Sequence, residues 1–486
     1  MSISVPSHAL RWWALGILAM TQLMVVLDTT IVTIALPQAQ LDLALSDDQR
    51  QWVVTAYALA FGALLLLGGR IADYWGRKRA FMVGMLGFGL ASAWGGLAHS
   101  GVELIVARGV QGAFAALLAP AALAMITVMF PYGRDRNIAF AVFGTVAGTG
   151  AAIGLVLGGV LTEFTSWRWC LLVNVVFVVV GMVGGSLLLK ESSTEGTNRY
   201  DVWGTLTVTL GLGALVYGFT LAEHGWGSAD TIAFLALGVV LLVLFVAIQR
   251  RVEHPLLPLR VVTHRVRAGA FLIQAIIGST MIGAMLYLTL HFQLVMGMSP
   301  LTAGLANVAM TIVIMAFTPV VTKALNRFGP RPLMITGPLL AAAGLFYLTG
   351  ISPEGSYVTQ ILPGLILMGI GLANLFVPLQ NLALAGVDAE DSGVASATVN
   401  STFHIGGSIG LAIFTVLYAN TVEGSLQDGT HQLVALTDGF SATFLATGVA
   451  MIVASAIAFV MIRGTRDELM PRWDEETATE RLASEP

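Results

Sequence analysis

The chain has 486 residues, of which 56% are hydrophobic and only 11% charged, and its mean hydropathy is +0.82. A soluble protein carries about 25% charged residues, so the composition excludes a water-soluble domain and indicates a polytopic membrane protein. The net charge of −4 is small, and no basic patch suggests a nucleic-acid partner. Cys170 is the only cysteine, which excludes an intrachain disulfide.

Apolar stretches long enough to cross a bilayer, about 20 residues each, follow one another along the chain. The first begins near Trp12 and is too long for the core of a signal peptide, so we expect it to be retained. In chain order the stretches are 12–36, 51–69, 80–98, 103–128, 138–162, 168–189, 202–222, 231–249, 268–296, 301–322, 333–350, 357–384, 400–420 and 440–462. The sequence therefore predicts an all-α protein with fourteen transmembrane helices.

The basic residues are distributed unevenly between the connections of these helices. Of the 24 Lys and Arg residues, all except Arg50, Arg108 and Arg168 fall on the side that also holds the two termini. Cytoplasmic loops carry an excess of Lys and Arg. We therefore predict that both termini are cytoplasmic and that the protein is a multi-pass protein of the plasma membrane.

A weak internal repeat relates the two halves. Shifting the sequence by 253 residues places Gly76 on Gly329, so that "RIADYWGRKR" overlies "KALNRFGPRP". The matching loops follow predicted helices 2 and 10, so two helices are inserted between two six-helix repeats, an arrangement typical of transporters. The predicted units are a first six-helix bundle over 12–189, an inserted helix pair over 190–267, a second bundle over 268–463 and a charged tail, expected to be disordered, over 464–486.

Several motifs together resemble the major facilitator superfamily, and within it the fourteen-helix drug:proton antiporter branch. "LDTTIVTIALP" begins at Leu27 and "LIVARGVQG" contains Arg108, Gln111 and Gly112; the loop signature after helix 2 is carried by Gly69, Asp73, Gly76, Arg77 and Lys78. The resemblance spans nearly the whole chain. It implies two six-helix bundles with two inserted helices and export driven by protons.

Two departures from that branch stand out. In helix 5, Gly150-Ala151 and Gly154-Leu155 replace the usual Gly-Pro pairs, and in helix 13 Phe403-His404 replaces an Arg-Gln pair. Both differences weigh against ordinary drug antiport and keep other substrates open.

Asp28 is the only carboxylate well inside a predicted span, and Arg108 is the only cation there. An ionised side chain at such a position costs roughly 3 kcal/mol or more. Asp28 should therefore face a cavity or carry a proton; the alternative is a structural hydrogen bond to a facing helix. The resemblance implies that Arg108 lies near helix 1 and tunes the protonation of Asp28, while a structural pairing with backbone carbonyls stays open.

The remaining candidate residues form three sets. We expect a cytoplasmic latch between Asp73, Arg77 and either Arg134 or Arg136, flanked by Gly69 and Gly76, with a purely topogenic role of these charges as the alternative. The substrate cavity is expected to include Tyr57, Gln111, Gln293, Asn374, Asn381 and His404. In helix 5, Gly144, Gly148, Gly154 and Gly158 lie on a face without side chains, which favours close helix packing.

These observations predict a proton-coupled exporter of amphipathic or cationic small molecules that works by alternating access, in contact with membrane lipid and as a monomer. An exporter of lipid, or of a dedicated metabolite such as an antibiotic, is an alternative within the same fold. A membrane sensor or scaffold is a second alternative. We find no Cys/His cluster, P-loop or nucleophile motif in the sequence, so we predict neither an enzyme nor a cofactor or metal site.

Overall fold

The computed structural model describes residues 8–130, 134–192, 201–222, 225–384, 387, 392–464 and 469. Within these residues every regular element is helical, and fourteen helices have 19 residues or more. They are α1 (His8–Leu43), α2 (Asp47–Trp75), α3 (Arg77–Gly96), α4 (Gly101–Met129), α5 (Arg134–Phe164), α6 (Trp169–Leu188), α7 (Val202–Leu221), α8 (Ala229–Gln249), α10 (Arg265–Leu290), α11 (Pro300–Phe328), α12 (Pro330–Leu348), α13 (Leu362–Leu384), α14 (Ser392–Gln427) and α15 (Gln432–Met461).

Three short elements complete the described part of the chain: α9 (Leu259–Thr263) and the π-helical segments η2 (His291–Val295) and η3 (Tyr357–Ile361). Thirteen of the long helices are long and apolar enough to cross a membrane, and α3, which opens with three cations, is the fourteenth. The all-α class and the predicted number of helices are confirmed. The charged tail predicted over 464–486 lies outside the described residues except for Gly464 and Leu469.

Serine N-caps set the start of several helices. The side chains of Ser46, Ser100, Ser228 and Ser299 each accept a hydrogen bond from a backbone N–H in the first turn of α2, α4, α8 and α11. Such caps satisfy N–H groups that have no partner within the helix. All four helices begin at one end of the molecule, which we call the Ala44 end because α1 is followed there by α2. The opposite end, where α2 is followed by α3, is the Gly76 end.

The turn between α2 and α3 is repeated between α11 and α12. α2 ends at Trp75 and α11 at Phe328, which are 253 residues apart, and the next residues, Gly76 and Gly329, have φ angles of +117° and +78°. Residues that carry a Cβ are strained at such angles. The predicted repeat is therefore present in the backbone, with a glycine turn at equivalent points of the two halves.

The helices pack as two bundles and a hairpin. Helices α1–α6 contact one another and form the N bundle, and α10–α15 form the C bundle. The α7–α8 hairpin lies between them in sequence: α7 packs against α2 of the N bundle and α14 of the C bundle, while α8 packs on α7. The rings of Trp52 and Tyr217 mark the contact of α2 with α7, with centroids 6.2 Å apart. The hairpin therefore touches both bundles along one side of their interface.

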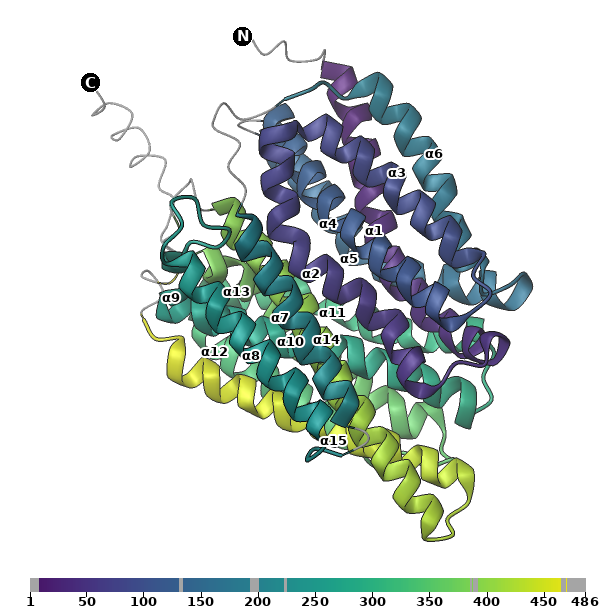
Figure 1. Ribbon diagram of the computed structural model, residues 1–486. Coiled ribbons are helices and arrows are strands. Elements are labelled where there is room, and N and C mark those ends of the chain that lie inside the picture. The colour runs from purple at the N-terminus through teal and green to yellow at the C-terminus, as the bar shows by residue number, and fades with distance from the viewer. Residues whose placement is uncertain are drawn as a thin grey trace.

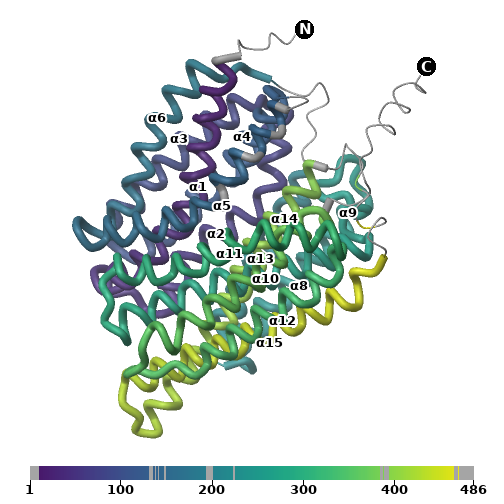
Figure 2. Tube along the Cα trace, turned by 180° about the vertical axis from the view of Figure 1, so that it is seen from behind, coloured from purple at the N-terminus to yellow at the C-terminus, as the bar shows by residue number. Residues whose placement is uncertain are grey.

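The two bundles converge towards the Ala44 end and diverge towards the Gly76 end, as both ribbon views show (Figure 1, Figure 2). The core follows the same division. N-bundle residues near the Ala44 end, such as Leu27, Ile31 and Trp167, belong to one buried cluster with the C bundle. N-bundle residues nearer the Gly76 end, such as Leu18, Phe81 and Ile126, form a separate cluster. The bundles are thus sealed together at the Ala44 end.

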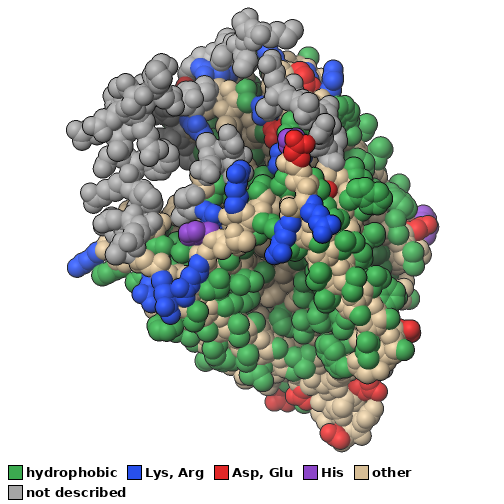
Figure 3. Space-filling model, turned by 60° about the vertical axis from the view of Figure 1, so that its left-hand side comes forward, with side chains coloured by type: hydrophobic (Ala, Val, Ile, Leu, Met, Phe, Trp, Pro, Cys, Tyr) green, Lys and Arg blue, Asp and Glu red, His purple; other side chains and the backbone are tan. Residues whose placement is uncertain are grey.

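Charged side chains are sorted along the same axis. On the face drawn in Figure 3, Lys and Arg lie in the upper and middle parts together with a few acidic side chains, whereas the lower tip carries acidic side chains and no Lys or Arg. Hydrophobic side chains cover most of the surface between the lowest Lys and Arg and this tip. Arg70, Arg77, Lys78 and Arg79 gather at the Gly76 end, whereas Glu423 and Asp428 belong to the connection of α14 and α15 at the Ala44 end. This is the charge asymmetry that the sequence predicted.

Candidate proton-coupling site

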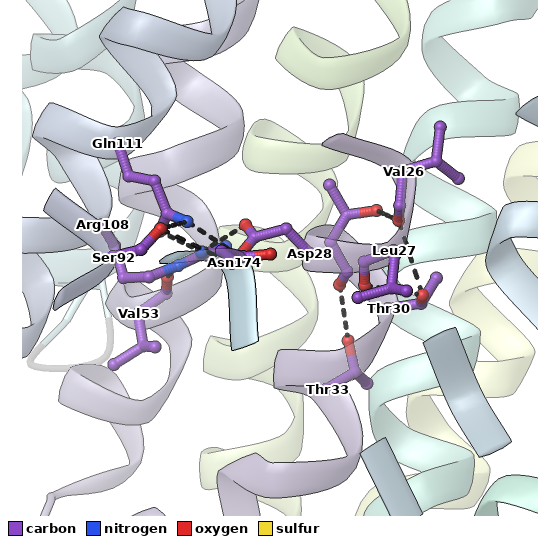
Figure 4. A network of polar contacts seen from close by, with 11 residues as sticks. Val26, Leu27, Asp28, Thr30, Thr33, Val53, Ser92, Arg108, Gln111 and Asn174 are labelled. Carbon is purple, nitrogen blue, oxygen red and sulfur yellow. Dashed lines mark hydrogen bonds and ion pairs between the residues drawn. The ribbon is translucent and has the colours of Figure 1, made fainter. Parts of the chain in front are cut away.

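Asp28 lies near the middle of α1 and is completely buried. Its Oδ2 accepts a hydrogen bond from Arg108 Nη1 of α4 at 2.6 Å, which makes the two residues a buried ion pair. Its Oδ1 accepts from Gln111 Nε2 at 2.8 Å and from Asn174 Nδ2 of α6 at 2.6 Å. Figure 4 shows these side chains converging on the carboxylate from neighbouring helices. Both carboxylate oxygens therefore have donors.

Arg108 is held from three further directions. Its Nε donates to the backbone oxygen of Val53 at 3.3 Å, and its Nη1 also donates to Gln111 Oε1 at 2.6 Å. The guanidinium lies over the ring of Tyr57, 4.3 Å from the centroid, where a cation is attracted to the π-face. α2 thus supports the cation that pairs with α1. Tyr57 and Gln111, predicted as cavity residues, belong to this network and are each only 1% exposed.

Ser92 and Asn174 complete the network and were not predicted from the sequence. Ser92 Oγ of α3 accepts from Gln111 Nε2 at 2.7 Å and from Asn174 Nδ2 at 3.5 Å. Asn174 is the only amide side chain in the apolar stretch that forms α6, and that was its available signal. A serine among glycines and alanines carries no such signal. The network therefore joins five helices of the N bundle around one carboxylate.

The charge of this arrangement depends on the protonation state of Asp28. As an ion pair the site is neutral, and its remaining polar groups are two uncharged amides, which donate, and a hydroxyl, which accepts. Protonation of Asp28 would leave the Arg108 guanidinium buried among neutral groups, which is unfavourable in a medium of low dielectric constant. The protonation state of one carboxylate therefore changes the stability of this packing of α1 against α4 and α6.

The predicted latch residues lie at the Gly76 end. Asp73 Oδ1 pairs with Arg77 Nη2 at 3.0 Å across the turn, with side-chain exposures of 43% and 16%. Arg136 lies 5.5 Å from the Phe140 ring centroid, and the side chain of Arg134 lies outside the described residues. A Cβ added to Gly69 would meet only Pro120, at 3.7 Å. The structure thus brings Asp73 to Arg77, within one loop.

A carboxylate that the sequence did not single out occupies the turn at Gly76. Glu191, which follows α6, accepts hydrogen bonds from the backbone N–H groups of Lys78 and Arg79 at 3.1 Å each. A Cβ on Gly76 would lie 2.6 Å from Glu191 Oε1. An acidic side chain at a helix N-terminus satisfies its free N–H groups and complements the helix dipole. The α3 start is therefore fastened to the segment after α6.

The other predicted cavity residues belong to the C bundle and differ in position. Gln293 Nε2 donates to the backbone oxygen of Ile34 in α1 at 3.0 Å, and the ring of His404 packs against Phe61 of α2 at 4.5 Å. Both therefore lie where the bundles meet. Asn374 is buried in α13, whereas Asn381 is exposed and donates to the backbone oxygen of Val377 within its own helix.

The glycines of α5 differ in how closely other helices approach them. Cβ atoms added to Gly154 and Gly158 would lie 3.0 Å from the backbone oxygens of Leu27 and Ile31, so α5 approaches α1 closely at these points. A Cβ added to Gly144 would meet no atom within 4 Å. The surroundings of Gly148 lie outside the described residues.

Bundles of this kind define a class of membrane transporter. The fold resembles that of a bacterial homolog of the human lysosomal transporter Spinster, with a TM-score of 0.67 at 17% identity over 94% of this chain and 98% of the other. It also resembles a peptide transporter POT solved in complex with sulfate, with a TM-score of 0.62 at 16% identity over 92% and 94% of the two chains. At these identities the likeness concerns the fold.

Sequence comparison identifies the family. The model of the Major Facilitator Superfamily matches residues 18–411 and again 268–484, and this chain belongs to that superfamily. Relatives include the puromycin resistance protein pur8 of Streptomyces alboniger, 43% identical over 93% of this chain and 91% of that protein. Others are the cephamycin export protein CmcT of Amycolatopsis lactamdurans, 36% identical over 85% and 86%, and the multidrug efflux pump LfrA of Mycolicibacterium smegmatis, 31% identical over 85% and 82%.

Proposed function

We propose that this chain exports amphipathic, mainly cationic small molecules in exchange for protons, and that Asp28 carries the proton. The observation behind this proposal is a completely buried carboxylate whose charge is balanced by one buried cation, Arg108. Intramembrane carboxylates of this kind mark proton or ion pathways. The names of the relatives, which include an efflux pump and antibiotic export and resistance proteins, support the export direction.

The excess of Lys and Arg supports a cytoplasmic Gly76 end and an external Ala44 end. The bundles are joined at the Ala44 end, so the described state is the one that faces the cytoplasm. Substrate enters between the diverging parts of the bundles in this state. The bundles then rock about the interface, separate at the Ala44 end and release the substrate outside, which is alternating access.

Protonation of Asp28 drives this cycle by changing the charge of the network. With Asp28 ionised, the ion pair stabilises the N bundle and leaves the site without net charge, so a cationic substrate is not repelled. With Asp28 protonated, Arg108 loses its counterion and its positive charge repels a cation. Binding of the proton and binding of a cationic substrate therefore oppose each other. The Asp73–Arg77 pair acts as the cytoplasmic latch, because its partial exposure allows Asp73 to exchange partners with a cation at the start of α5.

Transport by purified protein in vesicles tests this proposal. We expect a pH gradient to drive accumulation of ethidium, a fluorescent lipophilic cation, and the Asp28→Asn variant to reduce accumulation to the level of empty vesicles. Asp230→Asn is the matched control, because Asp230 is an exposed carboxylate in the first turn of α8. Accumulation by the folded Asp28→Asn variant equal to that of the unsubstituted protein would rule out Asp28 as the coupling group.

A single coupling carboxylate also sets the electrical behaviour of transport. One proton exchanged for one monovalent cation moves no net charge, so the driving force is about 1.4 kcal/mol per pH unit. Collapse of the pH gradient with nigericin should therefore stop ethidium transport, while collapse of the membrane potential with valinomycin should leave most of it. Equal inhibition by the two ionophores would exclude this stoichiometry.

Export of one particular antibiotic is the second candidate, favoured by the 43% identity to a puromycin resistance protein over most of both chains. A dedicated exporter should raise the inhibitory concentration of puromycin or a related aminonucleoside in an efflux-deficient host and leave that of ethidium unchanged. A polyspecific exporter should raise both. The Asp28→Asn variant, expressed to the same level, serves as the control in either case.

A further inference from the structure

The Ala44 end is closed by contacts that reach across the bundles. Arg50, in the first turn of α2, is only 3% exposed and pairs with Asp47 at 2.8 Å and with Gln40 Oε1 at 2.9 Å. Its guanidinium also lies 5.8 Å from the ring centroid of Tyr418 in α14 of the C bundle. On the α5 side, Glu163 accepts a hydrogen bond from the backbone N–H of Leu301 at 3.1 Å. The contacts between the bundles must break for the molecule to open outwards.

Two polar side chains of α2 are enclosed beneath this closure without partners. Gln51 is 1% exposed, and neither its Oε1 nor its Nε2 has a hydrogen-bond partner among the described residues. Thr55 is completely buried, and its Oγ1 likewise has none there. Buried polar groups are nearly always paired, because desolvation without a hydrogen bond is unfavourable. Gln51 and Thr55 therefore do not stabilise the state that is closed at the Ala44 end, and their presence is explained by a function in another state.

The positions of these side chains place them in the bundle interface. Gly62, eleven residues after Gln51 and seven after Thr55, meets α14: a Cβ there would lie 3.0 Å from His404 Cβ and 3.1 Å from the Ser401 backbone oxygen. Residues separated by seven or eleven positions share one face of an α-helix. Gln51 and Thr55 therefore lie on the face of α2 that meets α14, between the contacts of Gly62 and of Arg50.

Two polar side chains of α14 that lie between the contact with Gly62 and the Ala44 end are already paired. Ser408 Oγ donates to the backbone oxygen of His404 at 2.9 Å, and Thr415 shares a hydrogen bond with Tyr287 of α10 at 2.9 Å. Closing the interface therefore does not supply partners for Gln51 and Thr55. When the bundles separate at the Ala44 end, the same face of α2 becomes a wall of the outward cavity.

We propose that Gln51 and Thr55 form the exit-side binding site for the polar groups of the substrate. This inference rests on the proposed export function and assigns it a second set of contacts, distinct from the Asp28 network. The amide and the hydroxyl together offer donors and acceptors, which suit amine, hydroxyl or carbonyl groups on an amphipathic molecule. Neither side chain carries a charge. A cationic substrate that leaves the Asp28 network can therefore bind to them on its way out without being held by a second negative charge.

Cysteine labelling tests whether the site opens to the outside. The native Cys170 is completely buried, so Cys170→Ala provides a cysteine-free background. In it, Gln51→Cys and Thr55→Cys should react with a membrane-impermeant maleimide added outside cells under an inward proton gradient, and more slowly without the gradient. Leu41→Cys is the positive control, because Leu41 is 78% exposed at the same end. Labelling of Leu41→Cys without labelling of either α2 variant overturns the inference.

Substrate choice tests the binding role. The double variant Gln51→Leu/Thr55→Val keeps the shape of both side chains and removes their hydrogen bonds. We compare ethidium, which has two amino groups, with tetraphenylphosphonium, which has no hydrogen-bonding group. The ratio of ethidium to tetraphenylphosphonium efflux should fall roughly two- to tenfold, the range of one neutral hydrogen bond. An unchanged ratio overturns the binding role.

Labelling and the efflux ratio together distinguish a failure of the proposed export function from a failure of the exit-side binding site. If the unsubstituted protein moves neither cation, the proposed function fails for these cations, and the labelling readout still decides whether the α2 face opens outwards. If both cations are moved, an unlabelled Gln51→Cys variant or an unchanged efflux ratio counts against this inference alone.

Discussion

The two bundles repeat one backbone design and use it for different chemistry. Both place a glycine of positive φ between their second and third helices, and the N bundle encloses the buried ion pair of Asp28 and Arg108. At the offset that aligns the two turns, Met281 of the C bundle stands where Asp28 stands in the N bundle. Asn307, a buried polar side chain of α11, donates to Thr289 and to its own helix. The comparison supports the proposal that proton coupling resides in the N bundle, while the C bundle supplies neutral side chains.

Moving the carboxylate to the C bundle tests this division most severely. Met281→Asp combined with Asp28→Asn puts an acid into α10, whose only cations, Arg265 and Arg267, lie in its first turn. Without a counterion the carboxylate costs roughly 3 kcal/mol or more. We expect a large loss of thermal stability in detergent relative to Asp28→Asn alone, and no gradient-driven transport. Restored transport would mean that either half can carry the proton.

Removing one partner of the ion pair should be nearly as damaging. Arg108→Gln leaves Asp28 buried without a cation, and breaking a buried pair in this way costs about 3–5 kcal/mol. The double variant Asp28→Asn/Arg108→Gln removes both charges and should recover most of the lost stability, but not transport. A double-mutant cycle of unfolding temperatures measures the coupling. Additive losses would show that the two charges do not stabilise each other.

The repeated glycine turns should respond unequally to alanine. Gly76→Ala and Gly329→Ala each impose a backbone strain of roughly 1–3 kcal/mol. At Gly76 the added methyl group would also lie 2.6 Å from Glu191 Oε1, so the loss of stability there should be the larger. Glu191→Ala should shrink the difference between the two glycine variants in thermal unfolding. If Gly329→Ala is the more harmful, the Glu191 contact is not what distinguishes the turns.

The smallest expected effect compares two buried asparagines. Asn174→Ala removes a donor to Asp28, whereas Asn307→Ala removes a bond to Thr289 in the C bundle. Each should cost about 1 kcal/mol of stability. Because Asn174 is a direct partner of Asp28, its loss should also reduce gradient-driven ethidium transport. Asn307→Ala should leave that transport in place, and a loss of equal size in both variants would contradict the division.

Two residues of the site were predictable from the sequence because charged side chains are rare within membrane-spanning helices. Asp28 and Arg108 are charges within apolar spans, so their cost in lipid draws attention to them without any structure. Their partners Ser92 and Asn174 are neutral, and small polar residues are common enough in membrane helices to pass unnoticed. Arg50 was assigned to an external connection, because its position at the start of a span does not reveal that α2 buries it against the C bundle.

The sequence by itself determined the number of helices, the sorting of charge between the two ends, the repeated glycine turn and the one carboxylate inside a span. These properties follow from the thickness of the bilayer, the cost of charge within it and the backbone limits of residues other than glycine. Only the tertiary structure decided which polar groups surround Asp28, which end of the bundles is closed and which face of α2 meets α14. The physical reason is that a membrane helix is apolar both where it meets lipid and where it meets protein, so its hydrophobic pattern does not say which face turns inward.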